Sequence, residues 1–456
     1  MKRDVVIVGG GPAGAATAMF LLRQGITPLI VEAETFPRYH IGESLTGEGG
    51  QVIRRLGLEP KMTERAWPVK YGVKVYGPTA RTSWFVPVTA RDENWRLQDS
   101  FTWSVRRSEF DAMMFSEARR RGAEFLPGKA IRPLVHDDGS VHGVRVQAGG
   151  GGTLDIESEL LLDCSGQATF LANHRATGPK YLGAYDRQVA FFSQVTGAIR
   201  DSGEARDEKP GNTVILYQQK FHWAWFIPID GEVTSVGIVC PSAYFLDRKE
   251  SKQDFLLREI RELNPELARR IPEAHLVEDV HVIPNYSYQV RGFSGKGFLC
   301  IGDAHRFIDP IFSFGVTVAM REAEFIAPLV RAYLGNARTD NGNPFAGYQL
   351  SSERGIDVLE DMIDLFWEQP FTFAACVHRR YTDLLTDVFA GRLYEHQPSA
   401  GTLAFRKLLN RTEERERSYA DGDTYSIPIG SRYHPERAPL WQVRGADVAT
   451  TEHWLA

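Results

Sequence analysis

The chain has 456 residues, of which 43% are hydrophobic, and its formal net charge is −5. This length supports a large core or two to three packed subdomains, and the mixed charges exclude an extended nucleic-acid-binding surface or an acidic tail. Four cysteines are too few for a disulfide scaffold and too far apart in sequence for a metal site, so we expect no metal. No stretch approaches the roughly 20 apolar residues of a membrane span, and we expect a cytoplasmic protein.

The N-terminal segment predicts a strand, a helix and a second strand. Residues 4–8 are β-branched, residues 12–24 have helical periodicity, and residues 28–32 form another apolar run. Between the first strand and the helix, Gly-Gly-Gly-Pro-Ala-Gly satisfies the G-x-G-x-x-G pattern, in which glycines let the backbone approach a pyrophosphate at a helix N-terminus. An acid that closes the second strand accepts hydrogen bonds from a ribose. The residues assigned to a dinucleotide are Gly9, Gly11, Pro12, Ala13, Gly14, Glu32 and Ala33. The alternative is a tight strand-to-helix turn without a ligand.

Later segments change in character. Residues 130–164 alternate in short runs with turn signals, which predicts hairpins or a meander, and two β-rich stretches at 69–103 and 188–239 are expected to form a second sheet over the nucleotide domain. The chain after residue 347 is mostly helical in pattern. We therefore predict an α/β fold: a Rossmann-like nucleotide-binding domain, a second, mostly antiparallel β-sheet substrate domain and a helical C-terminal region. The predicted boundaries are 1–335, with inserted sheet regions at about 65–105 and 180–290, and 336–456.

Three further motifs follow in order. They are V-x-R-x-x-F-D at 105–111, Leu-Asp-Cys-Ser-Gly at 162–166, and an apolar strand that ends in Gly-Asp at 302–303. Together with the glycine motif, this set resembles the flavin-dependent aromatic hydroxylase superfamily. The resemblance implies FAD as the dinucleotide, with Arg107 on its polar chain, Asp303 on its ribityl hydroxyls, and Gly166 and Gly302 close to it. The alternative for Asp303 is a helix N-cap.

The segment His-Trp-Ala-Trp-Phe-Ile-Pro at 222–228 contains W-x-W-x-I-P, which resembles the flavin-dependent halogenases within that superfamily. Trp223 and Trp225, two apart on a strand, share one face, and their indoles can separate the flavin from an organic substrate. The alternative is that both tryptophans pack an ordinary core.

Residues 67–77 resemble the halogenase segment that carries the catalytic lysine, and Lys70 is the matching residue. Strand alternation places Lys70 and Lys74 on the same face, so periodicity does not choose between them, and either can be a solvent-facing lysine. The spacing to Gly72 favours Lys70. In this family the lysine orients hypohalous acid by hydrogen bonding or forms a haloamine with it.

Residues 307–316 resemble the halide-binding turn of the family, which opens a helix. The resemblance assigns a halide to Ser313, Phe314 and Gly315, and flavin contacts to Pro310, Gly315 and Val316. Tryptophan halogenases have a glutamate immediately before the serine, where this chain has Phe312. A second catalytic acid or base is then expected elsewhere, and free tryptophan is a less favoured substrate.

Residues 36–44 resemble the halogenase stretch that follows the ribose-binding acid and contacts or covers the flavin. The residues assigned here are Arg38, Ile41, Gly42, Glu43 and Ser44. The following Leu-Thr-Gly departs from the family pattern. We assign no catalytic role to His40, His222 or His305, because a buried, hydrogen-bonded histidine is the commoner case.

The resemblance implies a complete reaction. Reduced FAD from a separate NAD(P)H-dependent flavin reductase, oxygen and chloride or bromide yield hypohalous acid, which passes the tryptophan wall to Lys70 and halogenates an electron-rich aromatic compound. The substrate class is a phenol, pyrrole or indole, free or tethered to an acyl or peptidyl carrier protein, in secondary-metabolite or antibiotic biosynthesis. The alternatives are a flavin hydroxylase or epoxidase on the same scaffold and a non-catalytic flavin carrier. Halide dependence separates the first of these from a halogenase.

Overall fold

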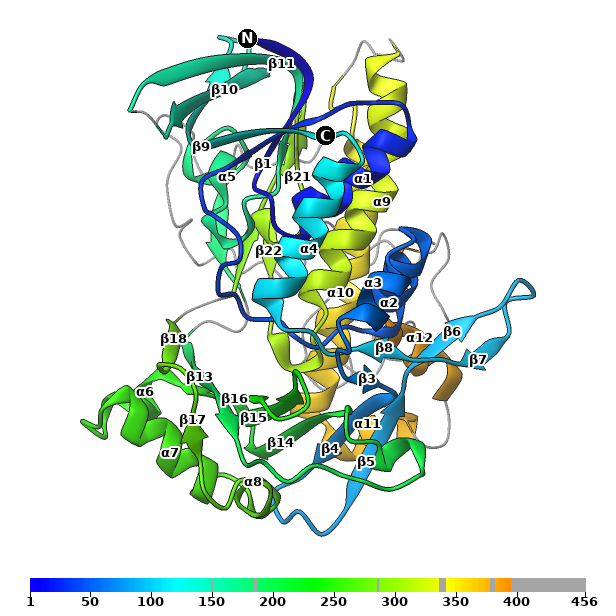
Figure 1. Cartoon of the computed structure of the whole chain (residues 1–456), viewed down its shortest axis with the longest axis vertical. Coiled ribbons are helices and arrows are strands. Elements are labelled where there is room, and N and C mark those ends of the chain that lie inside the picture. Colours follow the sequence, from blue (N-terminus) through cyan, green and yellow to red (C-terminus); the bar gives the residue numbers. More distant parts are fainter. Residues whose placement is uncertain (150, 184–186, 285–286, 336–341, 378–381, 395–456) are drawn as a thin grey trace.

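The computed structural model describes residues 1–149, 151–183, 187–284, 287–335, 342–377 and 382–394 (Figure 1). Two sheets lie at opposite ends of the long axis, and long helices run between them (Figure 1). The predicted α/β class, with a nucleotide-binding fold and a second sheet, is confirmed.

The first sheet is built around the N-terminal strand. Its order is β1-β2-β9-β10-β11-β21-β20, and β1 also pairs with β11. The β1, β2, β11 and β21 pairings are parallel, whereas β9, β10 and β11 form the predicted antiparallel meander. Its strands are β1 (Lys2–Val8), β2 (Leu29–Glu32), β9 (Glu124–Val135), β10 (Val141–Ala148), β11 (Thr153–Asp163), β20 (Ser294–Gly295) and β21 (Phe298–Cys300).

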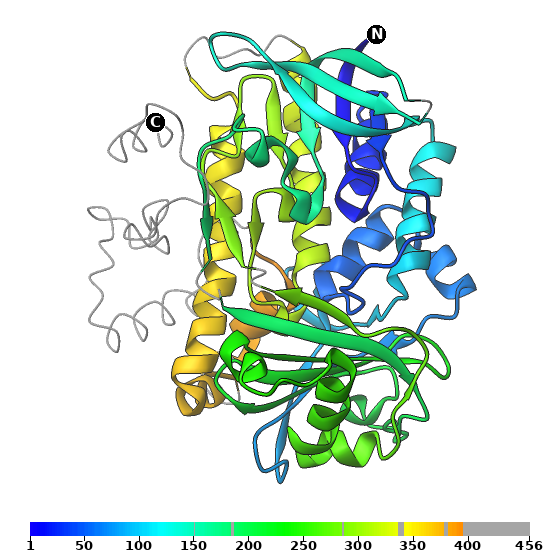
Figure 2. The ribbon, with the colours of Figure 1, turned by 90° about the vertical axis from the view of Figure 1, so that its left-hand side faces the viewer.

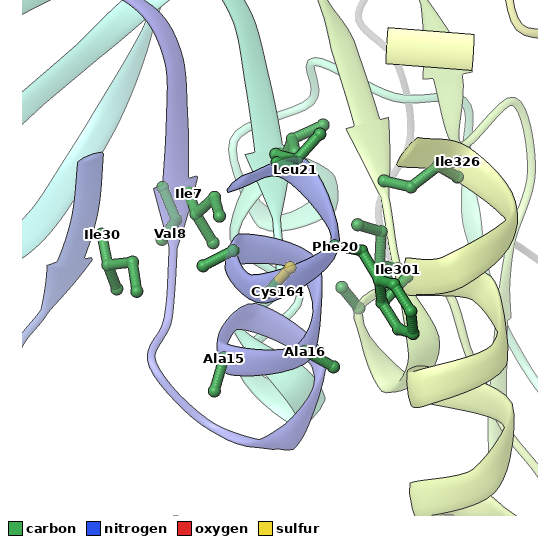
Figure 3. Close-up of a cluster of buried hydrophobic side chains, with 14 of the residues drawn as sticks. Ile7, Val8, Ala15, Ala16, Phe20, Leu21, Ile30, Cys164, Ile301 and Ile326 are labelled. Atoms are coloured by element: carbon green, nitrogen blue, oxygen red, sulfur yellow. The ribbon is translucent and has the colours of Figure 1, made fainter. Parts of the chain in front are cut away.

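Three helices cover one face of this sheet: α1 (Pro12–Arg23), α4 (Arg107–Arg120) and α9 (Gly315–Leu334). Small residues bring α1 close to β1, while Phe20 reaches toward α9 and lies beside Ile301, and Ile326 of α9 belongs to the same buried cluster (Figure 3). The first strand, helix and second strand thus form the predicted βαβ unit, whose helix begins at Pro12 directly after the glycines. The remaining helices of this half are α2 (Gly47–Arg55), α3 (Glu59–Glu64) and α5 (Phe170–Asn173).

The second sheet is mostly antiparallel, as predicted, with the order β17-β13-β16-β15-β14-β4-β5 and β18 paired to β13. Both β-rich stretches contribute to it, joined by the parallel β4–β14 pair. Helices α7 and α8 pack on one face through a separate hydrophobic core. The elements are β4 (Gly72–Tyr76), β5 (Ser83–Pro87), β13 (Gln188–Thr196), β14 (Thr213–Gln219), β15 (His222–Pro228), β16 (Thr234–Pro241), β17 (His275–Leu276), β18 (His281–Pro284), α6 (Ser242–Leu246), α7 (Lys252–Glu262) and α8 (Pro265–Arg270).

Three smaller sheets accompany the two large ones. Strand β3 pairs with β8, β6 pairs with β7, and the third sheet has the order β12-β19-β22. Their strands are β3 (Val69–Lys70), β8 (Thr102–Trp103), β6 (Thr89–Arg91), β7 (Leu97–Asp99), β12 (Lys180–Leu182), β19 (Tyr288–Val290) and β22 (Arg306–Phe307).

The C-terminal helices are α10 (Ala346–Glu368), α11 (Pro370–Ala375) and α12 (Thr382–Ala390), so the described part of this region is mainly helical, as predicted. Seen from the side, α10 runs along the molecule from the first sheet to the second (Figure 2). Its distal half packs on the other face of the second sheet. The remainder of the helical pattern expected after residue 347, beyond residue 394, lies outside the described residues. Among the described helices, none is long and apolar enough to cross a membrane.

Candidate active site

A cavity of about 890 Å³ lies between the two halves. Its lining comes from the glycine loop after β1, the loop at 38–44, the start of α9 and the tryptophans of β15. The predicted flavin, halide and tryptophan positions are therefore brought together around one space, although they span more than 300 residues of sequence.

The glycine loop has the geometry that a dinucleotide requires. Gly9 has a φ of +101°, and an added Cβ would lie 2.4 Å from the Cys164 carbonyl oxygen. At Gly14 an added Cβ would lie 1.9 Å from the Gly9 carbonyl oxygen, so both positions exclude side chains through packing within the protein. Gly11 meets only the far end of the Arg38 side chain and leaves room for a ligand at the N-terminus of α1.

Glu32, at the end of β2, faces the same cavity. One carboxylate oxygen accepts the Gly10 N–H at 2.7 Å and the other accepts the Glu34 N–H at 2.8 Å. Each carboxylate oxygen has two lone pairs, so this orientation leaves acceptors for ribose hydroxyls.

Arg107 begins α4 and lines the cavity, but its guanidinium is already engaged. It forms a bidentate pair with Asp111, at 2.8 and 3.0 Å, and donates to the carbonyl oxygens of Ile41 and Gly42. Burial opposes its charge, yet Asp111 outweighs this effect and raises the pKa of Arg107. Gly42 has a φ of +106°, and an added Cβ would lie 2.7 Å from the guanidinium. Arg107 therefore holds the loop at 41–42 against the cavity.

Asp303 follows β21 and projects its carboxylate toward the cavity, where burial, partly offset by Arg107 and His305, raises its pKa to about 6. No side-chain N-cap is formed here. Behind this turn, the buried Glu322 of α9 accepts the Gly302 N–H at 2.7 Å and lies 3.0 Å from His305 Nε2. Tyr348 and Ser352 of α10 also donate hydroxyls to Glu322, so α10 supports the turn that carries Asp303.

The predicted halide turn sits at the start of α9. A 3-10 turn covers Pro310–Phe312, Ser313 has a φ of +61°, and Phe314 is the N-cap residue of α9 without any side-chain cap. The first amides of a helix have no partner within the helix, and here they face a cavity that Ser313, Phe314 and Gly315 line. Pro310 and Val316 line it as well. The arrangement suits an anion.

Trp223 and Trp225 both line the cavity and are almost completely buried. Their ring centroids are 5.8 Å apart. The Trp225 indole lies over Gly237, where an added Cβ would be 2.1 Å from the ring, and its N–H donates to Ser235. The Trp223 N–H has no hydrogen-bond partner among the described residues.

Lys70 lies outside the large cavity and is only 2% exposed. Its Nζ donates to Ser44 Oγ at 2.7 Å and to the Leu45 carbonyl oxygen at 2.9 Å, and burial lowers its pKa to about 7. It borders a second cavity of about 20 Å³, which is about the size of one water molecule.

The expectation that Lys70 and Lys74 share one face of a strand is wrong. The strand is interrupted at Tyr71, because the Asn212 side chain accepts both the Tyr71 and the Gly72 N–H groups, at 2.9 and 3.0 Å. Lys70 then belongs to β3, whereas Lys74 belongs to β4 and contacts Asp207. The two amines have different surroundings.

Phe312, which stands where a tryptophan halogenase has glutamate, borders the small cavity beside Lys70. It packs in an aromatic cluster with Phe366, Phe373 and Phe389 from the three C-terminal helices. The lysine is thus covered by apolar rings.

The sequence analysis missed Asp309. This side chain is buried beside the halide turn, where Oδ1 accepts the Ile311 N–H at 3.0 Å. Burial, partly offset by the hydrogen bond from the Ile311 N–H, raises its pKa to about 7. The Asp-Pro pair before the turn was the available signal, since an aspartate before a proline often caps a turn and can bring its acid into a site.

The three histidines differ in their surroundings. His222 bonds Glu259 at 2.8 Å and His305 bonds Glu322, both within buried pairs. His40 lines the large cavity, and burial lowers its pKa to about 4, so it is neutral near pH 7.

Comparison with known proteins agrees with this geometry. The family model described as "FAD binding domain" matches residues 2–340. The chain is 36% identical over 375 residues to a 1H-pyrrole-2-carbonyl-[peptidyl-carrier protein] brominase of Pseudoalteromonas luteoviolacea, covering 81% of this chain and 87% of the relative. A corresponding chlorinase of Pseudomonas fluorescens is 27% identical over 414 residues, covering 86% of this chain and 91% of the relative. The structure of the flavin-dependent brominase Bmp2 matches with a TM-score of 0.83 and 33% identity, over 91% of this chain and 100% of that one.

The large cavity, the glycine loop and the family match define an FAD-binding oxidoreductase. More narrowly, the chain belongs to the flavin-dependent halogenases. It uses FAD and a halide, and the resemblance first indicated by the W-x-W-x-I-P motif is confirmed.

Proposed function

We propose that this halogenase acts on a pyrrole-2-carbonyl group tethered to a peptidyl carrier protein, with Lys70 as the catalytic residue. Two relatives with extensive coverage carry this substrate in their names, one a brominase and one a chlorinase. The observation that carries the catalytic assignment is the burial of Lys70 in an apolar site with a pKa of about 7.

The chain's own groups divide the work. Reduced FAD and oxygen, bound in the large cavity, supply the oxidising power that converts a halide to hypohalous acid. The amides at the start of α9 hold the halide, and Trp223 and Trp225 keep an organic substrate away from the flavin side. The remaining predicted flavin residues, from Gly9 to Val316, line the same cavity, except Gly14 and Gly302, which shape its turns.

Lys70 receives the hypohalous acid at the substrate side. A lysine with a pKa near 7 has a large neutral fraction at neutral pH. Its lone pair can accept a hydrogen bond from hypohalous acid, or it can attack the halogen, so that the O–halogen bond breaks and the hydroxide leaves as water with a proton of the amine. Either role directs the halogen to a carbon of the ring. Pyrrole is electron-rich, so no stronger activation is required.

The proposal includes a partner and a location. A separate NAD(P)H-dependent flavin reductase supplies reduced FAD, because the sequence contains no second glycine fingerprint for a nicotinamide dinucleotide. The protein works in the cytoplasm, in keeping with four buried cysteines that are all free thiols.

The test is a turnover assay with a flavin reductase, NADH and FAD, in which the substrates are carrier-bound pyrrole-2-carbonyl, free pyrrole-2-carboxylate and a phenol. Each is run with bromide, with chloride and without halide, and products are read by mass spectrometry. We expect a halogen isotope pattern only on the carrier-bound pyrrole. Halogenation of the phenol alone would contradict the substrate assignment, and an added oxygen that is independent of halide would support the hydroxylase alternative.

A further inference from the structure

The chain segment at 43–45 connects the flavin cavity to Lys70. Ser44 forms an antiparallel bridge with Ser104, and backbone hydrogen bonds on both sides join this segment to residues 103–105. The opposite edge of the 102–103 strand pairs with β3, where Lys70 faces Thr102. Ser44 and Lys70 therefore lie on the two outer strands of one small ribbon.

A chain of hydroxyl groups leads away from the lysine. Lys70 Nζ donates to Ser44 Oγ at 2.7 Å, and Ser44 Oγ lies 2.8 Å from Thr213 Oγ1. Either hydroxyl can donate in the Ser44–Thr213 pair, and in both cases this hydrogen bond restrains the Ser44 hydroxyl while it accepts from the lysine. The Leu45 carbonyl oxygen can only accept, so it fixes a second N–H of the lysine.

Two of the three positions around Nζ are thus occupied by protein groups. The third has no further partner in the described part of the chain, and Lys70 borders the small cavity. That position carries either the third proton or the lone pair of the amine. It is the position that can meet hypohalous acid.

We infer that Ser44 is a positioning residue, whose hydroxyl, oriented by Thr213, fixes the Lys70 amine so that its one remaining position faces the small cavity. This inference rests on the proposed catalytic role of Lys70. Ser44 also lines the large cavity, whereas Lys70 borders the small one, so the serine forms part of the wall between them.

The same ribbon contains buried hydroxyl groups that form no hydrogen bond with the described residues. Thr102 Oγ1 and Ser104 Oγ are buried and have no hydrogen-bond partner among the described residues, although both lie next to the segment that carries Ser44. Ser104 therefore offers a matched control, since Ser104→Ala removes a buried hydroxyl from the ribbon without touching the lysine.

The surroundings of Lys70 allow the effect of the Ser44 hydroxyl on the pKa of Lys70 to be measured. Burial alone lowers the pKa of Lys70. Lys74 on β4 and Asp387 on α12 belong to neighbouring elements, but the hydrogen-bond partners of the Lys70 amine in the described part of the chain are Ser44 and Leu45, and Lys74 and Asp387 bond other groups. The hydroxyl of Ser44 and the carbonyl of Leu45 are the dipoles that stabilise the ammonium form, so removal of the hydroxyl disfavours that form.

The experiment is an NMR titration of the full chain labelled with [13Cε]lysine, in which the Lys70 signal is assigned by its loss in Lys70→Met. We expect Ser44→Ala to lower the Lys70 midpoint by about half to one pH unit, the size of one hydrogen bond. Thr213→Val should lower it by less, Ser44→Thr should restore it, and Ser104→Ala should leave it unchanged. An unchanged midpoint in Ser44→Ala, or an equal shift in Ser104→Ala, would overturn the inference.

A second readout separates positioning from folding. With the substrate that the wild-type enzyme halogenates, Ser44→Ala should yield less halogenated product per flavin oxidised, with the optimum moved to lower pH. If the wild-type enzyme does not halogenate the carrier-bound pyrrole, the proposed substrate is wrong. The titration needs no substrate, and it decides the role of Ser44 in either case.

Discussion

The two cavities that flank Ser44 differ in size and in what surrounds them. The flavin cavity holds about 890 Å³ and is shaped largely by backbone: glycines, a helix N-terminus and a loop held by Arg107. The lysine cavity holds about 20 Å³ and is bounded by side chains and by the end of α12. The flavin cavity therefore has room for a large ligand, whereas the lysine cavity, about the size of one water molecule, is smaller than the proposed pyrrole substrate.

Replacement of Lys70 is expected to give the largest effect, because it should stop halogenation at the lysine cavity without stopping flavin oxidation in the flavin cavity. Lys70→Met removes the amine and leaves the flavin cavity intact, so halogenated product should fall by roughly 100-fold or more while reduced flavin is still oxidised by oxygen. Product mass and oxygen consumption are measured together. Lys74 lies on β4 and pairs with Asp207, so the Lys74→Met variant should keep most of the activity. Comparable losses in both variants would refute the assignment of Lys70.

A change at Glu32 tests the flavin side alone. Glu32→Gln keeps one acceptor oxygen and replaces the other with a donor, so the Gly10 N–H and the ribose hydroxyls compete for fewer lone pairs. We expect the Kd for FAD to rise about 10-fold, in keeping with the loss of a charge-assisted hydrogen bond. Flavin fluorescence titration measures it, with Glu124→Gln on β9 as the control. An unchanged Kd would show that Glu32 does not contact the ribose.

The cover over the lysine side is held by an ion-pair cluster. Asp387 of α12 bonds Arg91 Nε at 3.0 Å and Arg392 Nε at 2.6 Å. Asp387→Asn should loosen α12, so that a few-fold more hypohalous acid escapes per flavin oxidised, because it removes the charge that pairs with two largely buried arginines. A halogen-trapping dye measures the escaped acid. Equal escape from wild type and variant would mean that α12 does not seal the site.

The smallest expected effect concerns Asp309. Its folded-state pKa of about 7 lies above the usual value, so the folded protein keeps a proton that the unfolded chain releases, and stability falls as pH rises from about 4 to 7. Asparagine does not ionise, so Asp309→Asn removes this decrease in stability between about pH 4 and pH 7. The variant should unfold about 1–3 °C higher than the wild type at pH 8 and closer to it at pH 5.5. A difference of equal size at both pH values would mean that Asp309 is ionised throughout.

The sequence predicted best the parts of the site that depend on local backbone conformation. The glycine pattern, the acid at the end of β2 and the Gly-Asp turn each follow local rules, and the structure places all of them around one cavity. The surroundings of Lys70 were harder to predict, because strand periodicity was applied across Lys70 and Lys74 as if they belonged to one strand. The interruption comes from Asn212, which lies more than 130 residues away, and such a long-range contact leaves no local signal.

The residues that contact Lys70 were equally difficult to predict from the sequence. Ser44 was assigned to the flavin by resemblance, and it does line the flavin cavity, but its hydroxyl bonds Lys70 through a ribbon assembled from three separate segments. The cover formed by Phe312 with residues of α10, α11 and α12 also depends on tertiary packing. Resemblance selected the candidate residues, and the fold shows which of the two cavities each one lines.

Helix α10 has a further consequence. Near its start, Tyr348 and Ser352 hold Glu322 behind the flavin turn, and near its end Phe366 packs on Phe312 over the lysine. The helix has 23 residues and so spans about 34 Å as one stiff rod. Each residue advances an α-helix by about 100°, so a single insertion between these two groups of contacts would turn one of them away from its partners. The spacing along this helix therefore fixes the distance and rotation between the wall of the flavin cavity and the aromatic cover of the proposed lysine site.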